Sequence, residues 1–416
     1  MSATKSFDIS KLVVYDAWKA VKANKGSAGI DNETIDDFER NLKGNLYRIW
    51  NRMSSGSYFP PPVKAVPIPK KSGGERILGI PTVADRVAQM VAKMVLEPTV
   101  EPIFLPDSYG YRPGKSAIDA IDITRRRCWK FDWVLEFDIK GLFDNIDHDL
   151  LLRALEKHTA YAWVKLYVKR WLTAPLQHAD GTLVERTKGT PQGGVISPIL
   201  ANLFLHYTFD VWMTRQHPNN LWCRYADDGL VHCETEEQAH DIRRALQERF
   251  AECGLEMHPD KTKIVYCQDS NREEKYPITK FDFLGYCFKR RGVKNQSLNA
   301  MFSGFGPAVS QSSLNAMRAK IRELNLRNRS DMSLQEIAQL ANPILRGWIN
   351  YYGQFYRTAL YPMFRHFNET LVRWALRKYK KLRRKKVRGC QFMERIAKQH
   401  PSLFVHWQCG LVGNFI

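Results

Sequence analysis

Two short apolar runs that end in carboxylates constrain the fold of this chain more than any other feature. The run "WVLEFD" leads directly into Asp138, and "LWCRYADDGLVHC" places Asp227 and Asp228 between two apolar stretches. Such runs predict β-strands, and the Asp-Asp-Gly turn predicts a hairpin. A turn with two aspartates is more often ordinary hairpin chemistry. If the strands are neighbours, however, three carboxylates converge at strand ends.

A cluster of three carboxylates has a chemical consequence. Like charges repel and raise one another's pKa unless a cation compensates them. Carboxylate oxygens suit Mg²⁺, which also binds substrate phosphates, and two such ions can stabilise both the attacking and the leaving oxygen of a phosphoryl transfer. The pattern therefore indicates nucleotidyl transfer with two Mg²⁺ ions as the cofactor.

Charge is distributed unevenly along the chain. Of the 63 Lys and Arg and the 43 Asp and Glu, residues 290–416 contain 23 and 5, so this last part carries +18 of the net charge of +20. Many basic side chains bind polyanions because they neutralise phosphates and release counterions. Nucleic acid is the leading class of partner, and an anionic membrane surface is the second.

The cysteines and the apolar segments indicate the compartment. The eight cysteines show no C-x-x-C spacing, which argues against a disulfide framework and against a zinc ribbon. The N-terminus has no apolar core of signal-peptide length, and no segment approaches the roughly 20 apolar residues that cross a bilayer. We expect a soluble, cytoplasmic protein.

Apolar periodicity predicts an α+β fold. It indicates helices over residues 7–24, 33–53 and 82–97, and the Gly73-Gly74 turn joins two apolar runs into a hairpin. After about residue 300 helical periodicity takes over, which marks a second, helical module. Further strands are expected at residues 133–137, 221–225, 230–233, 263–267 and 281–288.

An ordered series of motifs resembles the reverse transcriptase and maturase proteins encoded by bacterial group II introns. "YADD" and "FDIKGLFDNIDH" stand among "NKGSAGID", "IPKKSGGERILGIP", "YGYRPGKSA", "GTPQGGVISPILANLFLH", "GLEMHPDKTKI" and "FDFLGYCF", and "NPILRGWINYYGQFY" is similar to the maturase signature. The resemblance covers roughly residues 24–360. No Cys-pair and His-Asn-His pattern follows residue 360, so the chain resembles the short form that lacks the C-terminal HNH endonuclease.

The resemblance implies a right-hand polymerase with fingers, palm and thumb, preceded by a helical N-terminal extension and followed by a helical basic region. The expected boundaries are 1–60 for the extension, 61–300 for the fingers and palm, 301–370 for the maturase or thumb domain, and 371–416 for the basic nucleic-acid-binding region.

In the resembled family the three aspartates are catalytic. Asp138, Asp227 and Asp228 would hold the two Mg²⁺ ions, together with the backbone carbonyl of Ile139. Asp227 is the firmer choice as a shared metal ligand, whereas Asp228 is either a ligand or a nearby charge.

Residues of the neighbouring motifs would bind the incoming nucleotide. One of Lys70 and Lys71, together with Arg76, would contact the triphosphate, because both kinds of cation bind phosphate. The alternative is an exposed edge hairpin protected by its charges. Phe143 would exclude a ribose 2′-hydroxyl or, alternatively, pack in the core. Gln192 would lie near the nascent base pair.

Two further residues carry open alternatives. Lys261 resembles a lysine able to donate a proton to departing pyrophosphate, although lysines that follow turns are common on surfaces. Arg112 would contact the template or the substrate, with a buried structural arginine as the alternative.

The C-terminal part of the chain would bind RNA. Arg346 lies in the maturase-like segment, and residues 373–390 contain ten basic and no acidic side chains. A solvated helix face is the alternative interpretation of this basic run. The candidate RNA-binding residues are Arg346, Lys380, Lys381, Arg383, Arg384, Lys385 and Lys386.

Together these features predict a bacterial RNA-directed DNA polymerase that also acts as a group II intron maturase and serves intron mobility. Its partners would be intron RNA as template and splicing substrate, a target DNA primer and dNTPs, with no membrane; the oligomeric state is not predicted. Two alternatives stay open: a domesticated reverse transcriptase in host defence or repair, and a non-enzymatic RNA-binding splicing factor.

Overall fold

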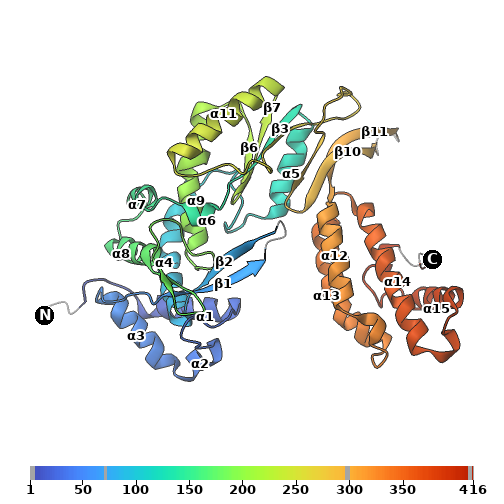
Figure 1. Ribbon diagram of the computed structural model, residues 1–416, viewed down its shortest axis with the longest axis horizontal. Coiled ribbons are helices and arrows are strands. Elements are labelled where there is room, and N and C mark those ends of the chain that lie inside the picture. Colours follow the sequence, from blue (N-terminus) through green and yellow to red (C-terminus); the bar gives the residue numbers. More distant parts are fainter. Residues whose placement is uncertain (1–4, 70–72, 296–299, 411–414, 416) are drawn as a thin grey trace. The chain divides into compact units, whose positions relative to one another are not determined.

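The computed structural model describes residues 5–69, 73–295, 300–410 and 415. They form two compact units, the first made of residues up to 120 with 134–264, and the second of residues 121–133 with those from 265 onward (Figure 1). The unit boundaries fall within α5 (Ala117–Cys128), at the start of β3 (Trp133–Asp138) and within β8 (Lys263–Tyr266). Lys70 and Lys71, expected at the triphosphate, lie outside the described residues.

The N-terminal extension is helical, as the sequence predicts, but the single helix expected at residues 33–53 is two helices that meet at Asn41. The helices of the extension are α1 (Lys11–Asn24), α2 (Ile35–Arg40) and α3 (Leu42–Ser54). Each of the first two begins at a hydroxyl residue that accepts a backbone N–H, and at Thr34 this becomes a capping box with Asp37. The Trp18 and Phe38 rings stack with centroids 4.9 Å apart, which joins α1 to α2.

The predicted hairpin forms and continues into a helix of the first unit. Strands β1 (Val63–Pro69) and β2 (Glu75–Ile80) are antiparallel, in a sheet of order β2-β1-β4-β5. Thr82 then caps α4 (Val83–Val100), a largely buried helix that contacts α1 and α3. The two short strands that complete the sheet are β4 (Leu176–Gln177) and β5 (Leu183–Val184).

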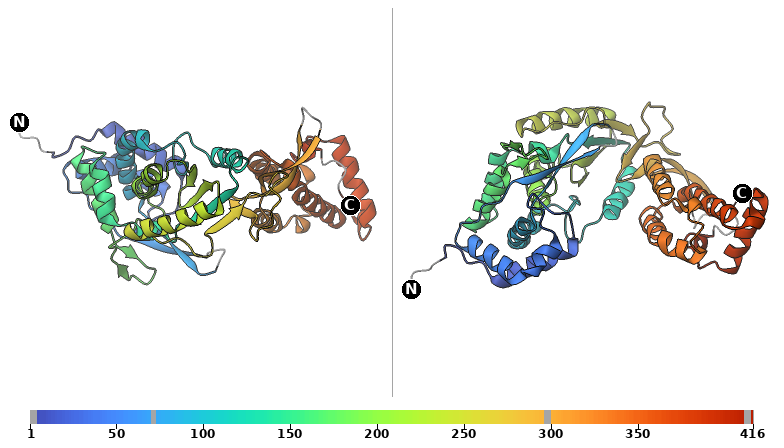
Figure 2. Two further views of the ribbon diagram at one scale, coloured as in Figure 1. Left: turned by 90° about the horizontal axis from the view of Figure 1, so that it is seen from above. Right: turned by 60° about the horizontal axis from the view of Figure 1, so that its bottom comes forward.

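A second sheet of the first unit carries the candidate site. Its order is β6-β7-β3-β8, with β6 (Trp222–Tyr225) antiparallel to β7 (Asp228–Cys233). Helix α11 (Glu236–Glu252) packs on this sheet (Figure 2). The ring centroids of its Phe250 and of Phe137 on β3 lie 5.8 Å apart. Further helices are α6 (Leu142–Asn145), α7 (His148–Glu156), α8 (Ala162–Thr173), α9 (Ser197–Leu205) and α10 (Val211–Gln216), with a π-helical turn at His206–Asp210.

The second unit begins with more β-structure than the sequence predicts. The single strand expected at residues 281–288 is two strands, β9 (Lys280–Phe283) and β10 (Tyr286–Asn295). Leu284 and Gly285 turn the chain between them with φ of 50° and 80°. The antiparallel partner of β10 is β11 (Ala300–Val309), so strand structure continues past the point where only helices are expected.

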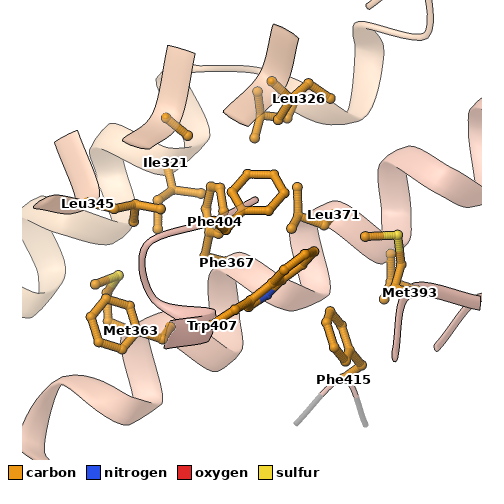
Figure 3. Close-up of a cluster of buried hydrophobic side chains, with 14 of the residues drawn as sticks. Ile321, Leu326, Leu345, Met363, Phe367, Leu371, Met393, Phe404, Trp407 and Phe415 are labelled. Atoms are coloured by element: carbon orange, nitrogen blue, oxygen red, sulfur yellow. The ribbon is translucent and has the colours of Figure 1, made fainter. Parts of the chain in front are cut away.

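Four helices of the second unit share one core. They are α12 (Gln311–Glu323), α13 (Leu334–Tyr352), α14 (Tyr361–Lys378) and α15 (Lys386–Gln399). Buried side chains of these helices and of the segment after them meet in a single cluster (Figure 3). The expected boundary at residue 370 falls inside α14. The side chains that converge include Ile321, Leu345, Met363, Phe367, Phe404, Trp407 and Phe415. The basic C-terminal region therefore belongs to the same folded body as residues 301–370.

Within the described residues, no helix combines the length and the apolar character needed to cross a membrane.

Replacing Trp407 with alanine tests whether the C-terminal segment supports the core of the second unit. Trp407 is 1% exposed, and removing such a side chain costs about 3–5 kcal/mol. We expect amide hydrogen exchange to accelerate in α12 to α15 and to stay unchanged in β3 and β7 of the first unit. Val387→Ala, at a side chain 65% exposed, is the control with no expected change. Equal protection in the two variants would contradict the shared core.

Candidate active site

The β6–β7 hairpin and the end of β3 bring three aspartates together. Tyr225 pairs with Asp228, so Ala226 and Asp227 form a two-residue turn, and Asp228 is the first residue of β7. Ala226 has a φ of 56°, which the tight turn requires. Because β7 lies beside β3, which ends at Asp138, the expected convergence of the three carboxylates is present.

Close backbone packing allows this approach. A Cβ added at Gly229 would lie 2.1 Å from Cζ of Phe137, so only glycine fits where β7 crosses the buried ring. The backbone N–H of Ile139 donates to the carbonyl of Asp227 at 3.1 Å. The hairpin tip and the end of β3 are thus joined directly, next to the carbonyl expected to hold a metal ion.

A buried ion pair holds the backbone of the β6–β7 turn. Arg224 and Asp210 are both 0% exposed, and two guanidinium nitrogens of Arg224 donate to the two carboxylate oxygens of Asp210 at 2.7 Å each. Arg224 Nη1 also donates to the carbonyl of Ala226 at 3.2 Å. The bidentate geometry fixes the guanidinium, and with it the carbonyl before Asp227. The sequence predicts no role for Arg224 or Asp210, although an arginine inside an apolar strand is a pattern that could have indicated one.

Burial and mutual repulsion disfavour the charged forms of two of the aspartates. Desolvation, followed by the charges of Asp227 and Asp138, raises the pKa of Asp228 to about 7, and Asp228 is hydrogen-bonded to Asp138. Desolvation also raises the pKa of Asp227, with the charge of Asp138 adding to the effect. Ionisation of all three aspartates is therefore unfavourable when the protein alone must compensate their charge.

One ammonium group offsets part of this charge. Lys261 Nζ donates to Asp138 Oδ2 at 2.9 Å, so the expected lysine does reach the site. Partial burial alone would lower the pKa of Lys261, but the hydrogen bond to Asp138 and the charges of all three aspartates outweigh burial and raise it. The lysine is therefore positively charged at neutral pH, next to the carboxylate that ends β3.

The donor set fits hard divalent cations. It consists of carboxylate oxygens whose charge is only partly compensated, which Mg²⁺ prefers, and Mg²⁺ completes its coordination with water and substrate phosphates. Within the described part of the chain, no three His, Cys, Asp or Glu side chains are already arranged to hold an ion by themselves. The Lys261 ammonium contacts Asp138 Oδ2, an oxygen that a metal ion would otherwise contact.

The loop of residues 189–195 and the turn that follows β3 lie against each other. Phe143 is half-buried, and its carbonyl accepts the N–H of Thr190 at 2.6 Å. Gln192 Nε2 donates to Asp144 Oδ2 at 2.9 Å. Two residues expected at the nucleotide, Phe143 and Gln192, are thus held by neighbouring segments.

Tyr111 is a site residue that was missed from the sequence. Its ring meets the Phe143 ring edge-on, with centroids 6.3 Å apart. Partial burial, and then the charge of Asp227, raise the pKa of Tyr111. A Cβ at the preceding Gly110 would lie 2.5 Å from the backbone nitrogen of Ala226, so this segment packs directly on the hairpin turn. Tyr111 lies next to Arg112 in the motif "YGYRPGKSA", but the sequence predicts a contact with the template or substrate only for Arg112.

The two expected arginines differ in their surroundings. Arg76 on β2 is exposed, and its charge lowers the pKa of Asp227, which opposes the stronger effect of burial. The Arg112 side chain is only 7% exposed. Its guanidinium donates to Glu101 at 2.9 Å and to the carbonyls of Leu105 and Ser108. The structure therefore favours the structural alternative for Arg112.

The candidate RNA-binding residues lie on the second unit. Arg346 is exposed on α13, and the basic run of residues 373–390 spans the end of α14, the largely exposed connection of residues 379–385 and the start of α15. This connection contains a short 3-10 helix at Lys380–Leu382, and Arg384 has a φ of 63°, so the run is not one continuous helix. The exposed side chains are Lys380, Lys381, Arg383, Arg384, Lys385 and Lys386.

Comparison with known protein families gives two matches. Residues 68–288 match the family described as "Reverse transcriptase (RNA-dependent DNA polymerase)". Residues 314–390 match the family described as "Group II intron, maturase-specific domain".

Individual relatives agree with these matches. "Group II intron-encoded protein LtrA" of Lactococcus lactis subsp. cremoris is 30% identical over 285 residues, which cover 65% of this chain and 46% of LtrA. "Protein YkfC" of Escherichia coli strain K12 is 30% identical over 329 residues, which cover 68% of this chain and 82% of YkfC. "Uncharacterized 91 kDa protein in cob intron" of Schizosaccharomyces pombe is 26% identical in an alignment that covers 87% of this chain and 52% of that protein.

The chain spans about half the length of LtrA, whereas the reverse transcriptase match alone takes in more than half of the chain. The α+β fold is accordingly that of a right-hand polymerase. The chain belongs to the family of group II intron-encoded reverse transcriptases, with a reverse transcriptase domain followed by a maturase-specific domain.

Proposed function

We propose that the protein is an RNA-directed DNA polymerase that also acts as a group II intron maturase. The observation that carries the proposal is the convergence of Asp138, Asp227 and Asp228 at the ends of β3 and β7, inside a matched reverse transcriptase domain. The reaction would join a primer 3′-hydroxyl to the α-phosphate of a dNTP and release pyrophosphate.

The three aspartates, together with the Ile139 carbonyl, would hold two Mg²⁺ ions. When bound, the ions supply Lewis-acid stabilisation of the attacking and leaving oxygens. The family match supports dependence on a divalent metal in general, and the carboxylate donor set favours Mg²⁺. Asp228, whose charge is disfavoured without a cation, would become a ligand as the metal offsets the repulsion from its neighbours.

Residues around the aspartates would bind the nucleotide. Arg76, on the hairpin of β1 and β2, would contact the triphosphate, as would Lys70 or Lys71. Phe143 would exclude a ribose 2′-hydroxyl, and Gln192 would lie at the nascent base pair. Lys261, already charged and next to Asp138, would donate a proton to the departing pyrophosphate.

The second unit would bind intron RNA. The maturase-specific match at residues 314–390 contains Arg346 and the whole exposed basic connection between α14 and α15. Basic side chains there would neutralise RNA phosphates and stabilise the active fold of the intron. The same RNA would then serve as template, with a target DNA strand as primer. The maturase match favours this proposal over a domesticated enzyme that has lost splicing.

Asp227→Ala tests the active site. We expect primer extension on an RNA template with Mg²⁺ and dNTPs to fall by roughly a thousandfold, the loss that corresponds to several kcal/mol of transition-state charge stabilisation. Asp241→Ala, which removes an exposed carboxylate on α11, should extend normally. The same two proteins are compared in splicing of the flanking intron RNA, where Asp227→Ala should retain activity. Extension by Asp227→Ala at the normal rate would refute the assignment.

The pKa of Asp228 predicts a pH dependence of stability in metal-free protein. Between about pH 4 and pH 7 the folded protein holds a proton that the unfolded chain has lost, so stability falls as the pH rises. Asp228→Asn removes this loss and should raise the unfolding temperature at pH 8, by roughly 2–4 °C per kcal/mol. Thermal unfolding in EDTA at pH 5 and pH 8 measures the effect, and Mg²⁺ should stabilise the wild type more than the variant. An identical pH dependence in both proteins would count against the coupled cluster.

Neutralising part of the basic run tests its role in RNA binding. Replacing Arg383, Arg384 and Lys385 with glutamine should weaken binding of the intron RNA and reduce the slope of log affinity against log salt by about 0.7–0.9 for each lost phosphate contact. The control replaces Lys169, Arg244 and Lys263, which are exposed on the first unit, and changes the net charge equally. An equal loss of affinity in the two triple variants would show that net charge alone acts.

A further inference from the structure

A chain of buried polar side chains starts at Asp85 on α4. Asp85 is 1% exposed, and its Oδ1 accepts hydrogen bonds from Tyr58 Oη at 2.8 Å and from Trp171 Nε1 at 2.7 Å. Its Oδ2 accepts from Gln89 Nε2, one turn further along the helix, at 2.9 Å. All three of these donors are neutral, so Asp85 is a buried carboxylate held by directional hydrogen bonds.

Gln89 extends this chain of hydrogen bonds to the end of the loop of residues 189–195. It is 1% exposed, and its Oε1 accepts the N–H of Val195 at 2.8 Å and that of Ile196 at 3.4 Å. Backbone N–H groups only donate, and Asp85 Oδ2 accepts from Gln89, so the Gln89 amide satisfies both neighbours in one orientation alone. Asp85 and the two loop N–H groups therefore fix together which end of the amide faces the loop.

The loop of residues 189–195 contacts two other segments that would bind the nucleotide, the turn after β3 and strand β2. Its Gly189 and Thr190 N–H groups donate to the carbonyls of Ile146 and Phe143 at 2.7 and 2.6 Å. The Gln192 carbonyl accepts the N–H of Gly79, on the strand that carries Arg76, at 3.0 Å. A shift of this loop would consequently move the backbone of Phe143 and Gln192 together.

The loop has little room to settle elsewhere. A Cβ added at Gly194 would lie 2.5 Å from Ser197 Oγ and 3.2 Å from Gln89 Oε1. Thr190 Oγ1 donates to the same Ser197 hydroxyl at 2.7 Å. Losing the Gln89 acceptor would leave the buried N–H of Ile196 and the N–H of Val195 without this partner, and even a small shift that relieves this loss would be transmitted along the tightly packed loop.

We propose that Asp85 and Gln89 are positioning residues for nucleotide selection: through the loop of residues 189–195 they set the place of Phe143, and so the preference for deoxyribonucleotides. This inference rests on the proposed polymerase function and deepens it. Neither side chain would touch the substrate. Their effect on the substrate would be transmitted by two hydrogen bonds of the loop. One runs from the Val195 N–H to Gln89, and the other from the Thr190 N–H to the Phe143 carbonyl.

The direction of the hydrogen bonds allows a compensating pair of substitutions. In Asp85→Asn the new amide nitrogen faces Gln89 Nε2, so two donors meet. In Gln89→Glu two carboxylates meet. In the double variant, the amide oxygen at position 85 still accepts from Tyr58 and Trp171, and the amide nitrogen there donates to the carboxylate at position 89. The second oxygen of that carboxylate accepts the Val195 N–H. The total charge of the double variant equals that of the wild type.

The measurement is the ratio of kcat/KM for a dNTP to kcat/KM for the matching rNTP, on one RNA template and DNA primer. The fraction of folded enzyme cancels in this ratio, so a purely structural role leaves it unchanged. We expect each single variant to lower the ratio by about tenfold, since ångström-scale misplacement is costly to catalysis. The double variant should return to within about threefold of the wild type.

Two further variants complete the design. Val91→Ala opens a cavity at a 0% exposed site on the same helix, outside the hydrogen-bond chain, and should lower stability without changing the ratio. Gln89→Met keeps the size of the side chain and removes the acceptor, so it provides a second test if a single variant does not fold. An unchanged ratio in the single variants, or a double variant no better than the singles, overturns the inference. Absence of extension by the wild type overturns the proposed function itself, and the inference with it.

Discussion

Electrostatic repulsion among Asp138, Asp227 and Asp228 is the constraint on which the first unit depends. The charges are forced together because β7 and β3 are neighbours and because Gly229 lets one strand close on the Phe137 ring. Burial makes the arrangement costlier still and is reflected in the raised pKa of Asp228. A fold that keeps such a cluster favours binding of cations and of the phosphates they accompany.

Two ion pairs hold this cluster in place. Arg224 and Asp210 form a buried ion pair beneath the hairpin turn, and Lys261 offsets charge at the surface of the site. An isolated buried ion pair is weak support for stability, but here it also holds the carbonyl that precedes Asp227. The second unit is organised differently, around one apolar core that leaves its basic connection exposed.

Much of the fold could be predicted from the sequence. The N-terminal helices, the hairpin of β1 and β2, and the strands that carry the aspartates follow from periodicities that span only a few residues. The prediction of one strand at residues 281–288 was wrong, because Leu284 and Gly285 turn the chain inside a mainly apolar run. Strand β11 was missed because its alternation is interrupted by glycines and a proline.

The sequence by itself determined which residues are available for chemistry: the three aspartates, the basic run and the motifs that show the family. Local patterns suffice for this, since strand ends, turns and charge density depend on adjacent residues. The tertiary structure alone decided that Lys261 contacts Asp138, that Arg112 is satisfied by its own segment, and that Asp85 and Gln89 connect to the loop of residues 189–195. The Lys261 and Gln89 contacts join residues more than a hundred positions apart, and the Arg112 contacts depend on where its side chain points; packing geometry settles both.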